Sequence, residues 1–151
     1  MSHAPYLGTI LPRISREGKR AYPPRLSQFT EHFWNGLSQG YWQTSCCHRC
    51  ELLTFPPKPI CPHCWSTEVY WKALSPRGKL YSWTRIHAAP AVFADEAPYA
   101  VGVVDLDCGI RLACRLLDQP DENLSIDMIM EIVVLQFEDG PLFAAQIMTK
   151  P

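Results

Sequence analysis

Five of the seven cysteines lie within 19 residues, and they form the arrangement with the clearest chemistry in the chain. Their spacing is Cys47-x2-Cys50 and then Cys61-x2-Cys64, with ten residues between the pairs. Each Cys-x2-Cys turn can place two thiolates on one side of a metal, so two turns complete a tetrahedron. Zinc is the expected ion, and iron is the alternative because soft thiolates serve both metals. Four thiolates leave no open coordination position, so we expect a structural ion.

The other cysteines and nearby histidines fit this metal site less well. Cys46-x3-Cys50 is a poorer match than Cys47-x2-Cys50. His48 and His63 lie inside the two turns, where we expect them to face solvent or to hydrogen-bond outside the cluster. Cys108 and Cys114 sit in apolar stretches typical of small core residues. The odd count of cysteines and the absence of an apolar signal core argue against a disulfide framework.

Three further patterns could do catalysis, and we expect none of them to do so. Gly36-Leu-Ser38-Gln-Gly40 matches a hydrolase nucleophile motif, but that motif needs a strand before the serine, whereas a helical pattern precedes it here. Asp105 and Asp107 alternate along a strand and flank a turn. His87 ends a strand, where a general base is the alternative to an exposed histidine. The sequence therefore favours a non-catalytic chain.

Composition and charge narrow the class of protein. The chain has 151 residues, of which 47% are hydrophobic and 19% charged, as in globular proteins. The net charge of -1 divides into +7 over residues 1–94 and -8 over residues 95–151. That acidic half opposes a basic groove for nucleic acid. No apolar run reaches the ~18 residues of a membrane helix, and we expect a cytoplasmic protein with no membrane partner.

The elements that must position the cysteines are predicted in four segments. We expect an extended basic arm over residues 1–26, an N-terminal helix over 27–40, a metal ribbon over 41–74 and a β-barrel over 75–151. Ser27 can cap the helix, and Gly40 can end it. Phe29, Phe33 and Leu37 recur at helical spacing and predict its apolar stripe, with Trp34 beside it.

Five short strands are predicted after the ribbon, over residues 79–87, 99–106, 110–117, 128–137 and 142–148. Alternation places Leu80, Ser82, Thr84 and Ile86 on one face of the first strand. The loop over residues 88–98 is long enough to be functional. Five short strands without a long helix suit a closed barrel of the OB-fold type. The predicted fold class is mainly β, with an N-terminal helix, a four-cysteine zinc ribbon and a C-terminal five-stranded OB-fold barrel.

An ordered set of motifs resembles one known family. The motifs are Phe33-Trp34-x-Gly36-Leu37-x2-Gly40, the two cysteine pairs, Phe55-Pro56-Pro57-Lys58-Pro59, Gly78-Lys79-Leu80-Tyr81-Ser82-x-Thr84 and Pro98-Tyr99-Ala100-Val101. Over residues 27–148 they resemble the rubredoxin-like zinc-ribbon plus OB-fold proteins of domain-of-unknown-function family 35. The chain departs from the family pattern at Glu51, Trp65 and Asp127, where glycine is common, and at Lys58, where arginine is common.

The resemblance implies an accessory subunit of acyl-CoA metabolism that completes a larger enzyme. The expected partner is a thiolase-like acyltransferase or aldolase, or a hot-dog-fold enoyl-CoA hydratase, in a hetero-oligomer. The alternatives are a single-stranded nucleic-acid-binding OB module and a rubredoxin-like iron electron carrier.

Two surfaces are predicted to carry binding. Acyl-CoA needs basic groups near aromatic faces, and we expect a cleft between ribbon and barrel to supply Lys58, Arg77, Lys79, Arg85, Trp65 and Trp83. The helix and the basic arm are the predicted partner-docking surfaces, with Phe33, Trp34 and Arg20 as candidate contacts.

Overall fold

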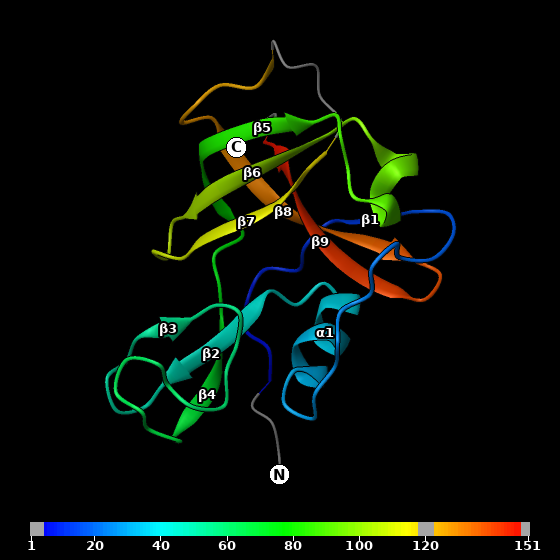
Figure 1. Ribbon diagram of the computed structural model, residues 1–151. Helices are drawn as coiled ribbons and strands as arrows, with labels where there is room; N and C mark the ends of the chain where they lie inside the picture. Colours follow the sequence, from blue (N-terminus) through cyan, green and yellow to red (C-terminus); the bar gives the residue numbers. More distant parts are fainter. Residues whose placement is uncertain (1–4, 118–122, 149–151) are drawn as a thin grey trace.

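The computed structural model describes residues 5–117 and 123–148, and it divides into a β-barrel, a small ribbon sheet and one short helix (Figure 1). The barrel consists of β5 (Arg77–Ile86), β6 (Tyr99–Leu106), β7 (Arg111–Leu116), β8 (Ile129–Phe137) and β9 (Gly140–Ile147). β5, β6, β7 and β9 pair in that order, and β8 pairs with both β9 and β5, so the sheet closes. A closed five-stranded barrel confirms the predicted fold class.

A bulge in β5 corrects the predicted inward face of that strand. The pairing with β6 shifts between Leu80 and Ser82, so Tyr81 is the extra residue. Leu80 is fully buried, whereas Ser82 and Thr84 beyond the bulge are exposed. An extra residue reverses the alternation of faces in the rest of the strand. Trp83, rather than Ser82, therefore packs against the core.

The ribbon is a three-stranded antiparallel sheet built around the cysteine pairs. β2 (Gln43–Cys47) lies in the centre, between β3 (Leu53–Thr54) and β4 (Val69–Ala73). All five residues of β2 are buried. The two cysteine turns project from one end of this sheet, away from the barrel (Figure 1).

The helix is shorter than predicted and begins later. α1 spans Glu31–Ser38, after a turn in which Ser27 and Thr30 exchange hydrogen bonds. Ser27 still makes the predicted capping hydrogen bond, one turn before α1: its hydroxyl oxygen accepts from the N–H of Thr30, and its carbonyl oxygen accepts from the N–H of Glu31. Gly40 ends the helix with φ 86°, as predicted. Phe33 and Leu37 are buried, which confirms that part of the apolar stripe.

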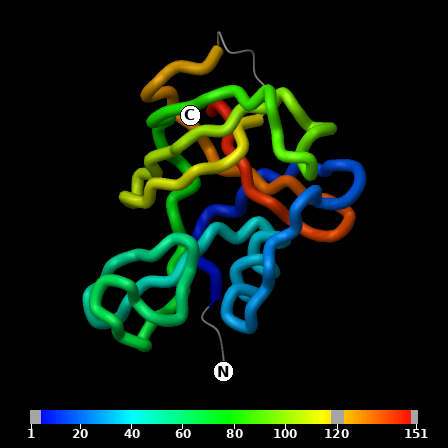
Figure 2. Tube along the Cα trace, viewed as in Figure 1, coloured from blue at the N-terminus to red at the C-terminus, as the bar shows by residue number. Residues whose placement is uncertain are grey.

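The N-terminal arm packs along the barrel. Its segment β1 (Arg13–Ser15) pairs in parallel with the second half of β8. Figure 2 shows the arm running past the barrel before it reaches α1. The expectation of a simple extended arm thus missed a strand, because only the open edge of β8 gives these residues a partner.

Five aromatic side chains join helix, ribbon and barrel. Phe33 and Trp34 come from α1, Trp42 and Phe55 flank ribbon strands, and Phe143 comes from β9. Ring centroids are 5.2 Å apart for Trp42 and Phe143, and 5.9 Å apart for Phe33 and Phe55. We call these five side chains the aromatic cluster. It packs the three parts against one another as a single hydrophobic core.

Candidate metal centre

The four thiols of the two cysteine pairs come together at the end of the ribbon. Their Sγ atoms all lie within 4.8 Å of one another. The Sγ atoms of Cys47 and Cys64 are 3.5 Å apart, and those of Cys50 and Cys61 are 3.6 Å apart. A tetrahedron with Zn–S bonds of about 2.3 Å has edges of roughly 3.8 Å. The thiols therefore fit one tetrahedral metal ion.

Backbone amides orient two of these sulfurs. The N–H groups of Arg49 and Cys50 lie 3.3 and 3.5 Å from Cys47 Sγ, and the N–H of His63 lies 3.4 Å from Cys61 Sγ. These donors favour the thiolate form. The N–H of Cys50, followed by that of Arg49, lowers the pKa of Cys47 to about 6 despite the opposing effect of burial. Cys47 can therefore offer a thiolate at neutral pH.

Both turns close with a residue in the left-handed region. Glu51 has φ 61° and Trp65 has φ 64°, and each directly follows the second cysteine of its pair. Their N–H groups donate to the carbonyls of Cys47 and Cys61, respectively, at 2.9 Å. The third non-glycine residue with positive φ among the described residues is Asp127, before β8. These are the three positions at which the resemblance led us to expect glycine.

The remaining candidates stay outside the four-thiol cluster. Cys46 is buried, and its Sγ lies 3.7 Å from the carbonyl oxygen of Glu51. His48 packs on the ring of Tyr70 at 4.2 Å, and His63 is exposed. Burial raises the pKa of Cys114 to about 12, so this thiol stays protonated.

The residues predicted to bind acyl-CoA do not line one shared cavity. Trp65 is 79% exposed at the end of the ribbon, and Lys58 is exposed in the segment between β3 and β4. Arg77 and Lys79 lie exposed at the start of β5, whereas Arg85 lies near its end. Only Trp83 lines either of the two cavities described here, a shallow one of ≈180 Å³ on β5, β6 and β7.

The three predicted docking residues are all engaged within the chain. Phe33 is 2% exposed, and Trp34 stacks on Phe143 at 6.3 Å. The Arg20 guanidinium donates to the carbonyl oxygens of Asp139 and Pro141, and its Nε lies 3.4 Å from Asp139 Oδ1. Arg20 thus fastens the arm to the β8–β9 turn. Among these three residues, Trp34 keeps a partly exposed face that a partner could contact.

The candidate acid–base groups are engaged elsewhere or exposed. Asp105 accepts two hydrogen bonds from Arg111, at 2.6 and 3.0 Å. These bonds hold the pKa of the Asp105 carboxyl below its usual value. Ser38 ends α1, so helical residues rather than a strand directly precede it. His87 is exposed at the end of β5.

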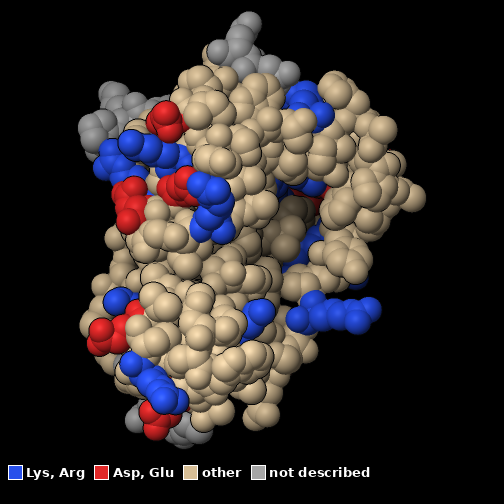
Figure 3. All heavy atoms as spheres, turned by 60° about the vertical axis from the view of Figure 1, so that its left-hand side comes forward, with Lys and Arg blue, Asp and Glu red and all other residues tan. Residues whose placement is uncertain are grey.

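The charged surface does not resemble a nucleic-acid interface on the face seen in Figure 3. Basic and acidic side chains lie next to one another there, and no continuous basic stripe crosses it. A groove that follows a phosphate backbone needs such a stripe. No helix among the described residues is long and apolar enough to span a bilayer.

A four-thiol ribbon packed through buried aromatics onto a five-stranded barrel defines a zinc-ribbon plus OB-fold protein. Two family descriptions match the chain in that order: the ChsH2 rubredoxin-like zinc ribbon domain over residues 34–69, and the ChsH2 C-terminal OB-fold domain over residues 71–136. A DUF35 domain-containing scaffold protein of Methanocaldococcus jannaschii is 35% identical over 96 residues, which are 62% of this chain and 68% of that protein. The chain belongs to the DUF35 family.

Other relatives are named as parts of enzymes. A benzoylsuccinyl-CoA thiolase subunit BbsA of Thauera aromatica is 36% identical over 49% of this chain and 50% of its own length. A probable enoyl-CoA hydratase alpha subunit of Thermomonospora curvata is 35% identical over 54% of this chain and 25% of its own length. A solved structure of an Ltp2-ChsH2(DUF35) aldolase contains a chain that superimposes with a TM-score of 0.73, at 26% identity, over 83% of this chain and 98% of that one.

Sequence reasoning did not find the largest of the cavities described here. It is a space of ≈270 Å³ lined by residues of the arm, of the loop before β6 and of three barrel strands. Its residues are far apart in the sequence and form no motif.

Proposed function

We propose that this chain is a non-catalytic scaffold subunit of a thiolase-like enzyme that acts on acyl-CoA substrates. The observation that carries the proposal is its superposition along nearly the whole length of the DUF35 chain in the Ltp2-ChsH2 aldolase structure. The relative that is named as a thiolase subunit supports the same class of partner.

The architecture supports a scaffold role. The aromatic cluster makes helix, ribbon and barrel one core, and a single packed body can hold a partner in a fixed orientation. The acid–base candidates are paired or exposed, so the chemistry would belong to the partner. The partly exposed face of Trp34 and the arm beside it are the docking surface we propose, since neither is covered on its outer side.

Co-expression with the thiolase-like chain of the same host tests this function. We expect a stoichiometric complex on size-exclusion chromatography with light scattering, and acyl-CoA cleavage that requires both chains. Trp34→Ala should weaken the complex at least tenfold, whereas Val92→Ala, in the 3-10 helix Ala91–Glu96 before β6, should not. A chain that stays alone at about 10 μM of each protein would contradict the proposal. If the chain forms a complex with a hydratase chain instead, its function is that of a hydratase subunit.

We also propose that Cys47, Cys50, Cys61 and Cys64 hold one structural zinc ion. The Sγ separations support a small tetrahedral ion with no vacant position for substrate. The bound ion would hold the two turns together, while the amides of Arg49, Cys50 and His63 stabilise the sulfur charges. Elemental analysis of protein purified without added metal should give one zinc per chain. A red protein with visible absorption would identify iron and the electron-carrier alternative.

Acyl-CoA binding by the isolated chain stays a prediction. The exposed basic groups of β5 and the ring of Trp83 are its best support, although they form no closed pocket. Titration calorimetry with acetyl-CoA should detect binding that Lys79→Gln weakens. The absence of heat at about 1 mM ligand would assign CoA binding to the partner alone.

A further inference from the structure

The cavity of ≈270 Å³ lies outside the metal centre and outside every residue set predicted to bind acyl-CoA. Its floor is apolar and consists of Leu116, Leu117, Leu135 and Phe137, from the ends of β7 and β8. Leu117, Leu135 and Phe137 belong to a small hydrophobic cluster that is separate from the main core. The cavity is therefore a built feature of the barrel surface, with apolar packing beneath it.

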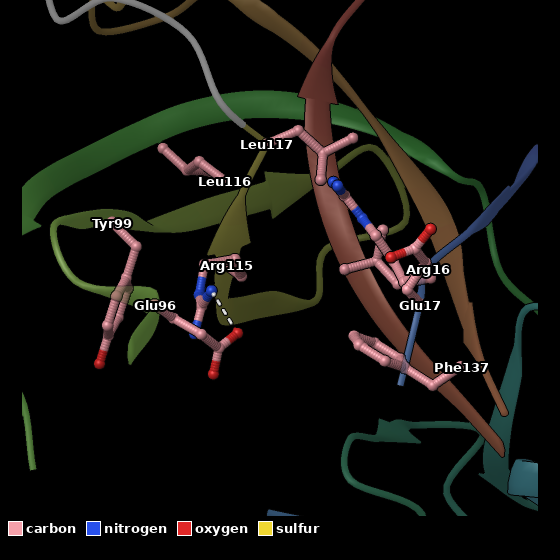
Figure 4. A pocket seen from close by; sticks show the side chains of 9 residues that line it. Arg16, Glu17, Glu96, Tyr99, Arg115, Leu116, Leu117 and Phe137 are labelled. Atoms are coloured by element: carbon pink, nitrogen blue, oxygen red, sulfur yellow. Dashed lines mark hydrogen bonds and ion pairs between the residues drawn. The ribbon is translucent and has the colours of Figure 1, made fainter. Parts of the chain in front are cut away.

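Charged groups lie on two sides of this floor (Figure 4). On one side, Arg115 lies 3.8 Å over the ring of Tyr99, and its Nη1 is 3.3 Å from Glu96 Oε1. On the other side, the arm supplies Arg16 and Glu17. The two sides come from segments about 100 residues apart in the sequence, and only the packed arm brings them together.

Arg115 is oriented by the aromatic ring as well as by its ion pair. A guanidinium carries five N–H donors in a fixed plane, and one of them is used in the bond to Glu96. The guanidinium of Arg16 makes no ion pair or hydrogen bond with the described residues. Donors on both sides of an apolar floor are the arrangement that recognises a carboxylate attached to an apolar body.

The volume of the cavity and the net charge of its lining restrict the kinds of ligand that can bind there. Two arginines and two glutamates leave the lining neutral, so a single negative charge is favoured over two. A volume of ≈270 Å³ lies just below the roughly 300–1,000 Å³ of pockets for drug-sized ligands, so it suits a small aromatic or short aliphatic acid.

We propose that this cavity is a binding site for small amphipathic monocarboxylates. The carboxylate pairs with Arg115 and Arg16, and the apolar body packs on Leu117, Leu135 and Phe137. Neither the metal centre nor the face of Trp34 contributes to this site, which shares only Arg16 and Glu17 of the arm with the proposed docking surface. Binding of a small acid by the isolated chain therefore tests the site separately from the scaffold function.

Amide NMR titration of the full chain with benzoate tests the site. We expect saturable shifts confined to the ends of β7 and β8, to Tyr99 and to the arm, with a Kd of about 1 mM. Benzamide, the neutral isostere, and phthalate, the dianion, should each bind at least tenfold more weakly. Scattered or non-saturating shifts at about 10 mM benzoate would overturn the proposal.

The fold offers a matched control for the key arginine. Arg111 also lies 3.8 Å over a tyrosine ring and pairs with an acid, Asp105, but it lines no part of the cavity. Arg115→Gln should weaken benzoate binding at least tenfold, and Arg111→Gln should leave it unchanged. Equal effects of the two substitutions would overturn the proposal. Leu117→Trp keeps both arginines and fills the space, so it should abolish binding if the cavity is the site; retained binding in this variant would also overturn it.

Discussion

Three non-glycine residues with positive φ each hold a strained backbone conformation that this fold requires. Glu51, Trp65 and Asp127 hold the left-handed conformation that glycine adopts without steric cost. For other residues this conformation costs about 1–2 kcal/mol. Trp65 is also 79% exposed, so burial of its ring does not offset that cost.

Trp65→Gly should therefore stabilise the protein. We expect a gain of roughly 0.5–1 kcal/mol, because relief of the left-handed strain exceeds the entropy that glycine adds to the unfolded chain. Urea unfolding followed by circular dichroism measures it. Trp65→Ala is the control, since it removes the ring but keeps a Cβ at φ 64°. An equal gain in both variants would mean that the ring, not the backbone, carries the cost.

A second residue-scale prediction concerns the pair of Arg20 and Asp139. The backbone N–H of Arg20, together with its guanidinium, holds the pKa of the Asp139 carboxyl below its usual value. The carboxylate therefore stabilises the fold above the ordinary pKa of an aspartate, and this contribution is lost as the pH falls through the lowered value.

Asp139→Asn should lower the stability of the fold at pH 7. The difference from wild type should stay constant above about pH 5 and shrink as the pH falls below the ordinary pKa of an aspartate, as thermal unfolding at a series of pH values would reveal. Asp107→Asn is the control, because Asp107 is exposed and its neutralisation should change the stability little. A difference independent of pH would show that lost packing, not charge, is responsible.

At the scale of elements, Gly140 and the aromatic cluster provide the contacts by which the arm, the helix and the ribbon pack on the barrel. Gly140 has φ 143°, and a Cβ there would lie 2.6 Å from the Arg20 guanidinium. This glycine lets the arm pack against the β8–β9 turn. In the cluster, Phe143 of β9 touches rings from both the helix and the ribbon.

Phe143→Ala should uncouple ribbon from barrel. We expect a loss of about 3 kcal/mol, because truncation leaves a cavity between three elements. Unfolding followed by tryptophan fluorescence should then separate from unfolding followed by circular dichroism, since ribbon and barrel no longer melt together. Val92→Ala, at a side chain that is 47% exposed, should change stability by less than about 0.5 kcal/mol. Coincident transitions in Phe143→Ala would argue that other contacts hold the two parts together.

At the scale of the whole molecule, the four-thiol centre compensates for a ribbon with little core of its own. β3 has two residues, and β2 depends on neighbours on both of its edges. The two pairs of cysteines bring four sulfurs within 4.8 Å of one another. A bound cation would offset the repulsion between their thiolates. Metal binding and folding of the ribbon are therefore expected to be coupled.

Cys61→Ser should remove the metal and unfold the ribbon, because the free energy of metal binding is part of the folding free energy. Elemental analysis, together with amide hydrogen exchange over residues 43–73, measures both effects. Cys108→Ser, outside the cluster, should keep the metal and the exchange protection. A metal-free Cys61→Ser protein with wild-type protection in the ribbon would refute the structural role.

The sequence alone predicted the features that depend on local spacing. The cysteine pairs, the five barrel strands, the glycine that ends the helix and the inward positions of Phe33 and Leu37 arise from turns and periodicities a few residues long. The family assignment rests on the same kind of ordered motif, and the relatives confirm it.

Tertiary structure decided what depends on contacts between distant segments. The bulge at Tyr81 and the pairing of β1 with β8 result from register and from available partners, which periodicity does not encode. The engagement of Arg20 with Asp139, and the cavity between Arg16 and Arg115, join residues about 100 or more positions apart. Local preferences determine which elements form, and long-range packing determines which side chains are left to bind something else.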